Sequence, residues 1–240
     1  MAYLDLSWRA FRPAEGFYTS EVQAPDRLPV RTFLPTGYEP NYPYPLLVFL
    51  HGHGSSDEQI MKLAPRLSRR NFISIGLRGP APLEPRLDGR LGYGWGDLSE
   101  SDSLIEDYVF RAVEQTRRHY HVHSERIYLA GFREGAGLAY RLGLTFPEKF
   151  TGVISLNGCI PRQGGPLLRL HEVRQLKVLI GHGYANASIP LAMARADYRL
   201  LYSAGLAVSL HTYPTTHKLH PAMLRDVNRW IIDQCTDPEM

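Results

Sequence analysis

The chain has 240 residues, of which 44% are hydrophobic and 21% are charged, a balance that is ordinary for a globular protein and unlike that of a disordered one. Its formal net charge is only +3 at pH 7, and no block of five or six like charges occurs, which argues against a nucleic-acid-binding tail. The longest apolar runs, such as PLLVFL at 45–50, are far shorter than the roughly 20 residues of a membrane-spanning helix, so no membrane span is predicted.

Strands and helices are expected to alternate along most of the chain. Short β-branched or apolar runs between Gly and Pro predict strands, and apolar residues at intervals of three and four predict helices. In chain order we expect strands at 17–22, 30–34 and 45–50, a helix at 58–70, a strand at 72–77, a helix at 102–120, a strand at 126–130, a helix at 134–144, strands at 152–156 and 177–180, a helix at 191–204, a strand at 207–213 and a helix at 221–234.

This alternation predicts an α/β fold with a mostly parallel, doubly wound sheet and helices on both faces. Most strand runs are hydrophobic throughout, as strands buried on both faces are. The runs 17–22 and 30–34 have no helix between them, so we expect them to form an antiparallel pair at one edge. We expect residues 1–240 to form one domain, with residues 1–16 as an N-terminal extension. Residues 79–96, rich in Gly, Pro and Arg, are a candidate rim of a ligand site, and the sequence leaves open whether they form a lid.

The stretch 127–137, IYLAGFREGAG, predicts a strand that turns directly into a helix. Gly131 and Gly135 lie two residues on either side of Arg133. This is the spacing of a nucleophile elbow, a tight turn that leaves no room for side chains at those two positions. Two glycines four apart are common in other contexts, so the interpretation depends on the neighbouring loops.

Three other loops follow strand ends in the order that accompanies such an elbow. Upstream, a predicted strand ends in HGHG at 51–54, where one amide of an oxyanion hole is expected. Downstream, one strand leads into the turn GHGYANASIP at 181–190, and the next ends in PTT followed by His217. Elbow, acidic turn and histidine turn is the chain order of an α/β-hydrolase triad.

The motifs resemble those of the phospholipase/carboxylesterase family of α/β-hydrolases, the acyl-protein thioesterase-like group, over roughly residues 28–234. In that family the elbow reads G-F-S-Q-G, the acid turn H-G-x-x-D-x-x-V-P, and the histidine follows Y-P-x-x. Here the elbow reads GFREG at 131–135, the acid turn HGYANASIP at 182–190, and the histidine segment YPTTH at 213–217. GWGD at 94–97 is similar to the family's G-x-x-W-F-D without its Phe. The resemblance implies the α/β-hydrolase fold and a family of carboxylic-ester hydrolases.

Carried over residue by residue, the resemblance places Arg133 at the nucleophile position, Asn186 at the acid position and His217 at the base position. A guanidinium is always protonated and only donates hydrogen bonds, so Arg133 cannot attack a carbonyl. Asn186 can hold an imidazole but cannot stabilise the imidazolium that forms during acyl transfer. In another hydrolase, loss of the nucleophile alone lowers turnover on the order of a million-fold. We therefore expect a degenerate triad and a non-catalytic pseudo-hydrolase.

The remaining elbow is expected to bind an anion. The backbone amides of Glu134 and His53 should point to one place at the helix N-terminus, which favours negative charge. Arg133 adds a full positive charge and a bidentate fork there. The predicted ligand is a small molecule with a carboxylate or a phosphate, or a partner. Glu134 is expected either to complement the helix dipole or to pair with Arg133.

A different nucleophile is the main alternative, and it would make the chain an active esterase or thioesterase. Cys159 is the best candidate, because it lies in the loop after the strand at 152–156, although a small buried loop residue is the competing interpretation. Ser55 and Ser56 are equally compatible with turn or helix-cap positions.

The histidines of HYHVH at 119–123 alternate as metal ligands do, and His51 and His53 form a second such pair. Residues 119–123 are expected to span a helix end and the loop before a strand, where solvated imidazoles are common. No metal site is therefore predicted.

Partners and location are less constrained. No cofactor is predicted, and the sequence leaves open whether the chain is a monomer or a homodimer. Residues 1–16 lack the apolar segment and the small-residue cleavage site of a secretory signal. The two cysteines, Cys159 and Cys235, are too few for a secreted disulfide scaffold. We therefore expect a cytoplasmic protein.

Overall fold

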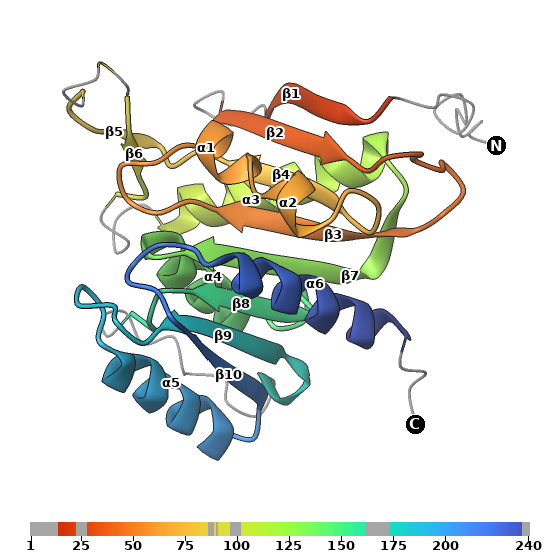
Figure 1. Ribbon diagram of the computed structural model, residues 1–240. Coiled ribbons are helices and arrows are strands. Elements are labelled where there is room, and N and C mark those ends of the chain that lie inside the picture. The colour runs from red at the N-terminus through yellow and green to blue at the C-terminus, as the bar shows by residue number, and fades with distance from the viewer. Residues whose placement is uncertain are drawn as a thin grey trace.

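An eight-stranded sheet forms the centre of the computed structural model, which describes residues 14–22, 28–85, 89, 91–96, 102–161 and 173–236. The strand order is β1-β2-β4-β3-β7-β8-β9-β10, and all neighbouring pairs from β4 to β10 are parallel (Figure 1). β1 and β2 pair antiparallel at one edge, as expected. The strands are β1 (Gly16–Val22), β2 (Leu28–Leu34), β3 (Tyr44–Leu50), β4 (Ile73–Leu77), β7 (Val122–Phe132), β8 (Gly152–Leu156), β9 (Lys177–Gly183) and β10 (Ala207–Tyr213).

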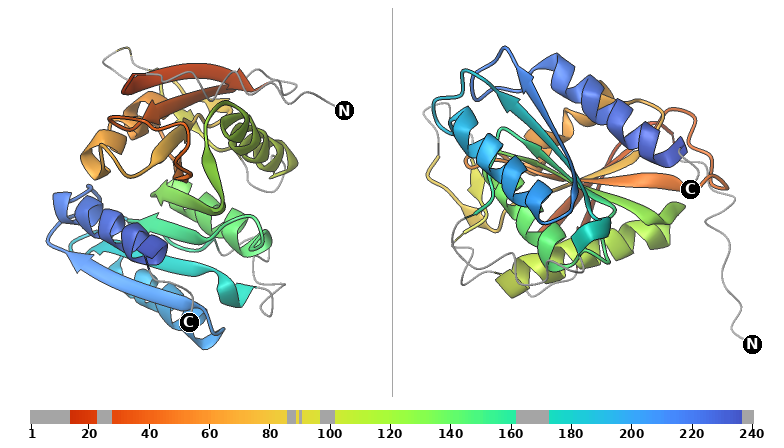
Figure 2. Two further views of the ribbon diagram at one scale, coloured as in Figure 1. Left: turned by 90° about the vertical axis from the view of Figure 1, so that its right-hand side faces the viewer. Right: turned by 90° about the horizontal axis from the view of Figure 1, so that it is seen from below.

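Helices cover both faces of this sheet. Within β3, Leu46, Val48 and Leu50 pack against the helices of one face, whereas Leu47 and Phe49 pack against those of the other. The right-hand view of Figure 2 shows α6 on the opposite side of the sheet from α3 and α4. One face carries α1 (Asp57–Met61), α2 (Ala64–Leu67) and α6 (Pro221–Thr236), and the other carries α3 (Asp102–His119), α4 (Glu134–Thr145) and α5 (Leu191–Ser203).

The architecture is that of the α/β-hydrolase fold, which confirms the fold class predicted from the sequence. The carboxyl ends of β3, β7, β8, β9 and β10 meet at one edge of the sheet because these strands are parallel. Open α/β sheets bind their ligands at that edge. No helix in the part of the chain that the structure describes is long and apolar enough to cross a membrane.

The helix expected at 58–70 is wrong in its extent, because the chain forms α1 and α2 instead, with a break at 62–63. Pro65 occupies the first turn of α2 and has no amide hydrogen with which to continue a helix from α1. Leu63 has helical φ and ψ but offers no side-chain cap, and Ser68 returns to an extended conformation. Proline therefore divides an amphipathic pattern that looks continuous in the sequence.

The rim segment is partly regular, and one further boundary needs correction. The rim segment 79–96 contains a short hairpin, β5 (Ala81–Pro82) with β6 (Tyr93–Gly94), although residues 86–88 and 90 lie outside the described part. β7 begins at Val122 and not at 126, because Tyr44 pairs with Val122 before an irregularity in the register. Most of the expected N-terminal extension, up to residue 13, lies outside the described residues, and the single domain stays a prediction.

Candidate functional site

The turn between β7 and α4 has the geometry expected of an elbow. Arg133 is the residue before α4, and its φ of 54° and ψ of −112° are rare for a residue with a side chain. A Cβ on Gly131 would lie 2.1 Å from the carbonyl oxygen of Gly135, and a Cβ on Gly135 would lie 2.2 Å from that of Leu50. The backbones therefore meet directly, which explains why both flanking positions are glycine.

Arg133 is held by its backbone, while its guanidinium has no partner among the residues that the structure describes. Its amide donates to the carbonyl of Leu156 at 3.0 Å, which joins the turn to the end of β8. The side chain is half-buried. Among the described residues, none forms a hydrogen bond or an ion pair with the Arg133 guanidinium. A half-buried positive charge without a partner is an available binding group for an anion.

The HGHG loop that follows β3 lies against the elbow. A Cβ on Gly52 would lie 3.1 Å from the carbonyl oxygen of Phe132 and 3.3 Å from the Cβ of Arg133. His51 is fully buried, and its Nε2 accepts from the Gly79 amide at 2.9 Å while its Nδ1 donates to the Gly52 carbonyl at 2.9 Å. Burial lowers the pKa of His51, so the neutral ring supports this loop.

The side chains of His53 and Glu134 form a pair across the elbow. The Nδ1 of His53 lies 3.7 Å from Oε2 of Glu134, which is buried and has no hydrogen-bond partner among the described residues. Burial raises the pKa of Glu134. Glu134 thus pairs with His53, and the expected alternative of a pair with Arg133 is wrong. Glu134 therefore does not neutralise the positive charge of Arg133.

Asn186 lies in the turn after β9 and is almost fully buried. Its Oδ1 accepts from the amides of Ser188 and Ile189 at 3.1 and 3.2 Å, which fixes the orientation of the amide group. Its Nδ2 is buried and has no hydrogen-bond partner among the described residues. The Asn186 atom that remains for a further hydrogen bond is therefore the donor Nδ2, whereas the acid of a triad must accept a hydrogen bond from histidine.

His217 is exposed, and no hydrogen bond joins it to another described residue. Its loop is nevertheless fixed against the acid turn. The Ala185 amide donates to the Thr215 carbonyl at 3.1 Å, and a Cβ on Gly183 would lie 2.3 Å from the carbonyl oxygen of Thr216. The acid and histidine turns thus lie side by side, as expected. Among the described residues, however, none orients the His217 imidazole by a hydrogen bond.

Asn157 was not anticipated, and it connects three of the loops. It follows β8 with a φ of 54°, a conformation that Asn tolerates better than most residues. Its Nδ2 donates to the Lys218 carbonyl at 2.9 Å, and its Oδ1 accepts from the Gly183 amide at 2.8 Å. Asn157 is fully buried and adjoins Leu156, which accepts from the Arg133 amide. One side chain therefore positions the acid and histidine turns relative to the elbow.

A buried carboxylate also supports the loop before α1. Asp57 is fully buried and accepts from the Nε atoms of Arg31 at 3.3 Å and Arg78 at 2.6 Å. The Arg78 guanidinium lies over the Tyr93 ring at 4.8 Å, which ties β6 to the end of β4. Trp95, fully buried, donates from Nε1 to the carbonyl of His51 at 2.8 Å. Asp97, the last residue of the GWGD segment, lies outside the described residues.

Cys159 is half-buried in the loop after β8. Its carbonyl oxygen would lie 3.5 Å from a Cβ on Gly137, and the neighbouring Gly158 would place a Cβ 2.8 Å from the Arg133 carbonyl oxygen. The loop of Cys159 therefore packs on the first turn of α4. Ser56 is the N-cap of α1 and accepts from the Gln59 amide at 3.3 Å, and Ser55 donates to the Gln59 side chain.

The histidines of 119–123 make separate contacts with the backbone. Nδ1 of His119 bonds the Gln115 carbonyl, Nδ1 of His121 bonds the Pro40 carbonyl, and Nδ1 of His123 accepts from the Glu125 amide. Within the described ranges, no three side chains of His, Cys, Asp or Glu are grouped closely enough to hold a metal ion.

A comparison with known protein families identifies the family of this chain. A family model described as phospholipase/carboxylesterase matches residues 40–234, which is most of the chain. The chain belongs to the phospholipase/carboxylesterase family. The resemblance found in the sequence motifs is thereby confirmed.

Curated relatives from this family match most of the chain. The acyl-protein thioesterase 1 of Mycosarcoma maydis is 27% identical over 215 residues, covering 77% of this chain and 89% of the relative. The acyl-protein thioesterase 1 of Gibberella zeae is 24% identical over 211 residues, covering 78% and 89%. A solved carboxylesterase from Mesorhizobium loti superposes with a TM-score of 0.70 at 23% identity over 89% of this chain and 98% of that one. The last likeness supports the fold alone.

Burial of His182, the residue before the glycine of the acid turn, makes stability depend on pH. Its Nε2 donates to the Ile189 carbonyl at 2.8 Å, its Nδ1 is buried without a partner in the described part, and burial lowers its pKa. The unfolded state, with a histidine pKa of about 6.5, therefore binds more protons below that pH than the folded state. We expect the free energy of unfolding to be constant near pH 7 to 8 and to fall as the pH decreases below about 6.5.

Urea denaturation at pH 7.5, 6.5 and 5.5 tests this expectation. Each such histidine contributes a slope of at most about 1.4 kcal/mol per pH unit. His182→Gln keeps a donor for the Ile189 carbonyl and cannot titrate, so its loss of stability between pH 6.5 and 5.5 should be smaller than that of the wild type. Identical pH slopes for the two proteins would show that His182 accepts a proton freely in the folded state.

Proposed function

We propose that this member of the phospholipase/carboxylesterase family is a pseudo-hydrolase that binds a small anionic ligand, a carboxylate or a phosphate, beside Arg133. The observation that carries the proposal is the half-buried guanidinium of Arg133, which has no partner among the described residues and stands at the nucleophile position. A guanidinium keeps its charge at any accessible pH, so this position offers recognition and no nucleophile.

The surroundings of Arg133 also favour an anion. The residue precedes α4, whose first amides carry the positive end of the helix dipole. The HGHG loop brings the His53 region into contact with the elbow. The carboxylate of Glu134 faces the imidazole of His53 at 3.7 Å and forms no ion pair with the Arg133 guanidinium. A carboxylate or phosphate could then accept the two parallel hydrogen bonds of the Arg133 fork.

The orientation of Asn186 supports the loss of the serine mechanism. Because its Oδ1 accepts from the amides of Ser188 and Ile189, Asn186 has only its Nδ2 donor left for a further partner. If that donor bonds one nitrogen of an imidazole, the neutral imidazole carries its proton on the other nitrogen. The protonated nitrogen then cannot act as a base toward residue 133. Arg133 and Asn186 are thus consistent with one another, because each removes a different part of acyl-transfer chemistry.

Calorimetric titration with acetate and with inorganic phosphate tests anion binding. Arg133→Met removes the charge and keeps an apolar stem of similar length, and it should weaken binding by at least about 10-fold, since a hydrogen bond to a charged group contributes about 1.5–3 kcal/mol. Arg199→Met, a change on α5 away from the sheet edge, is the matched control and should bind like the wild type. Equal affinity of the Arg133→Met and wild-type proteins would refute the proposal.

An esterase or thioesterase that uses Cys159 is the second candidate. Its support is the packing of the 158–159 loop on the first turn of α4, beside the elbow. An iodoacetamide probe and a fluorophosphonate probe separate the candidates. Labelling of Cys159 together with ester turnover that Cys159→Ser abolishes would favour this candidate over the pseudo-hydrolase. A cytoplasmic location and a homodimer stay predictions.

A further inference from the structure

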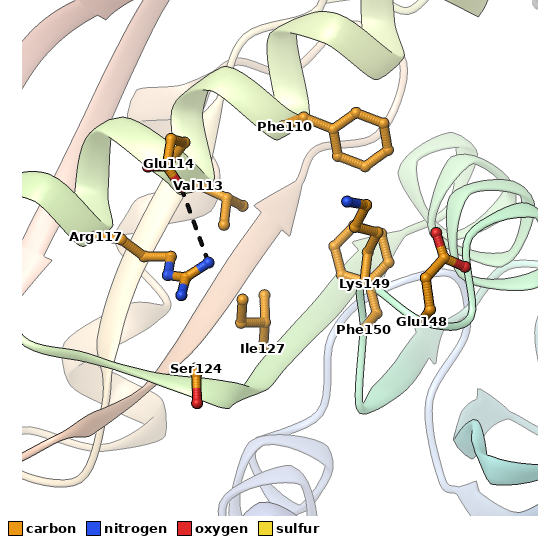
Figure 3. Close-up of a pocket in the computed structure, with 9 residues that line it drawn as sticks. All are labelled: Phe110, Val113, Glu114, Arg117, Ser124, Ile127, Glu148, Lys149 and Phe150. Carbon is orange, nitrogen blue, oxygen red and sulfur yellow. Dashed lines mark ion pairs between the residues drawn. The ribbon is translucent and has the colours of Figure 1, made fainter.

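A hollow lies at the end of the sheet opposite to the elbow. It has a volume of about 380 Å³ and lies between α3, the first residues of β7 and the segment 148–150 that precedes β8 (Figure 3). Its α3 wall, which includes Phe110, Val113 and Arg117, uses positions spaced by three and four residues and thus one face of the helix. Pockets for small molecules begin at about 300 Å³, so the hollow can hold a small organic ligand.

The inner walls of the hollow are apolar and aromatic. Val113, Ile127 and Phe150 are buried and belong to the hydrophobic core on the face of the sheet that α3 covers. The Phe110 ring meets Phe146 edge-on at 5.0 Å and lies nearly parallel to Phe150, with centroids 6.3 Å apart. These rings are therefore held in place by packing, and they present a preformed surface to a flat apolar group.

Two positive charges line the mouth of the hollow without full compensation. The Nζ of Lys149 lies 5.9 Å from the centre of the Phe110 ring, and no carboxylate of the described residues pairs with it. Arg117 reaches Glu114 only at 3.8 Å, and the same carboxylate accepts from Arg118 at 3.3 Å. One carboxylate is thus shared by two guanidiniums, so the positive charge of Arg117 is only partly compensated.

We propose that this hollow binds a small aromatic carboxylate, with its ring against Phe110 and Phe150 and its carboxylate facing Lys149 and Arg117. Aromatic walls select the flat apolar part, and the two cations select a negative charge. Two lining carboxylates oppose an anion. Glu114 is engaged by Arg117 and Arg118, and Figure 3 shows the Glu148 side chain on the far side of Lys149 from Arg117. This site is independent of the ligand proposed beside Arg133.

Calorimetric titration of the full chain with 2-naphthoate tests the ligand class. The neutral analogue 2-naphthamide has the same rings without the charge, and 2-naphthoate should bind at least 10-fold more tightly. Cyclohexanecarboxylate keeps the charge without an aromatic ring and should also bind more weakly than 2-naphthoate. Equal affinities of naphthoate and naphthamide would overturn the role of the cations, and the absence of any naphthoate binding would overturn the site.

Variants locate the binding site. Lys149→Met and Arg117→Met should each weaken 2-naphthoate binding by about 10-fold, whereas Glu148→Gln should strengthen it. Lys62→Met, a matched change of an exposed lysine directly after α1, on the other face of the sheet, should leave the affinity unchanged. Because these residues lie on the surface, circular dichroism melting curves should match the wild type. Naphthoate binding that survives Lys149→Met and is lost in Arg133→Met would place the ligand at the elbow and refute this inference.

Discussion

The double variant Arg133→Ser with Asn186→Asp is expected to hydrolyse short-chain p-nitrophenyl esters, whereas the wild type should show no more than a trace. Arg133→Ser supplies a hydroxyl at the elbow and removes a bulky cation from the point that a carbonyl must occupy. Asn186→Asp keeps an oxygen for the amides of Ser188 and Ile189. It replaces the buried Nδ2, which has no partner among the described residues, by an oxygen that can accept from His217. The glycines, the HGHG loop and His217 are already present.

The two changes should act together and not additively, because the members of a triad work as a unit. We expect the double variant to exceed the wild type by about 100-fold and either single variant to gain much less. The absolute rate should stay low, because His217 is exposed and no described residue orients it, and a misplacement of about 1 Å can lower a rate roughly 100-fold.

Fluorophosphonate labelling and ester turnover are the measurements for this variant. Adding His217→Ala to the double variant is the control, and it should abolish both signals, since the other histidine of this loop, His220, accepts from the Ala222 amide with its Nδ1. A folded double variant that stays inert and unlabelled would mean that these positions do not correspond to a triad. Ester turnover by the wild type that depends on His217 would instead reveal a nucleophile other than residue 133.

The succession of strands and helices along the chain and the placement of the loops were predictable from the sequence because both depend on local patterns. Apolar runs bounded by turn residues marked β3, β7, β9 and β10, and parallel strands bring their carboxyl ends to one edge. Gly131 and Gly135 were informative for the same reason. At both positions an added Cβ would lie about 2 Å from a backbone oxygen, so only glycine fits.

The side-chain pairs of the site could not be predicted in the same way. Glu134 was expected to act on the helix dipole or on its neighbour Arg133, yet it faces His53, which is far away in sequence. The role of Asn157 depends on contacts with Gly183 and Lys218 that no spacing in the sequence announces. Patterns identify which backbone segments meet, whereas the partner of a given side chain depends on the packing of loops from three or more strands.

Substitution of the glycine two residues after Arg133 should have the second large effect, which is on the free energy of unfolding. Gly135→Ala places a Cβ 2.2 Å from the carbonyl oxygen of Leu50 and 2.6 Å from that of His51, and both are backbone atoms that cannot rotate away. Either α4 or the HGHG loop must then move. Overpacking of this kind is expected to lower the free energy of unfolding by more than about 3 kcal/mol, at the upper end of single substitutions.

Gly137→Ala in the same helix is the matched control. Its Cβ would meet the Cγ of Pro161 at 3.3 Å and no backbone atom closer than 3.5 Å, so a small shift accommodates it. Alanine also favours a helix over glycine by up to about 1 kcal/mol, so this variant should stay within about 1 kcal/mol of the wild type. Urea denaturation with far-UV circular dichroism measures both variants. If Gly135→Ala proved as stable as Gly137→Ala, the contact between the elbow and the end of β3 would be absent, and Arg133 would not occupy the nucleophile position on which the anion site depends.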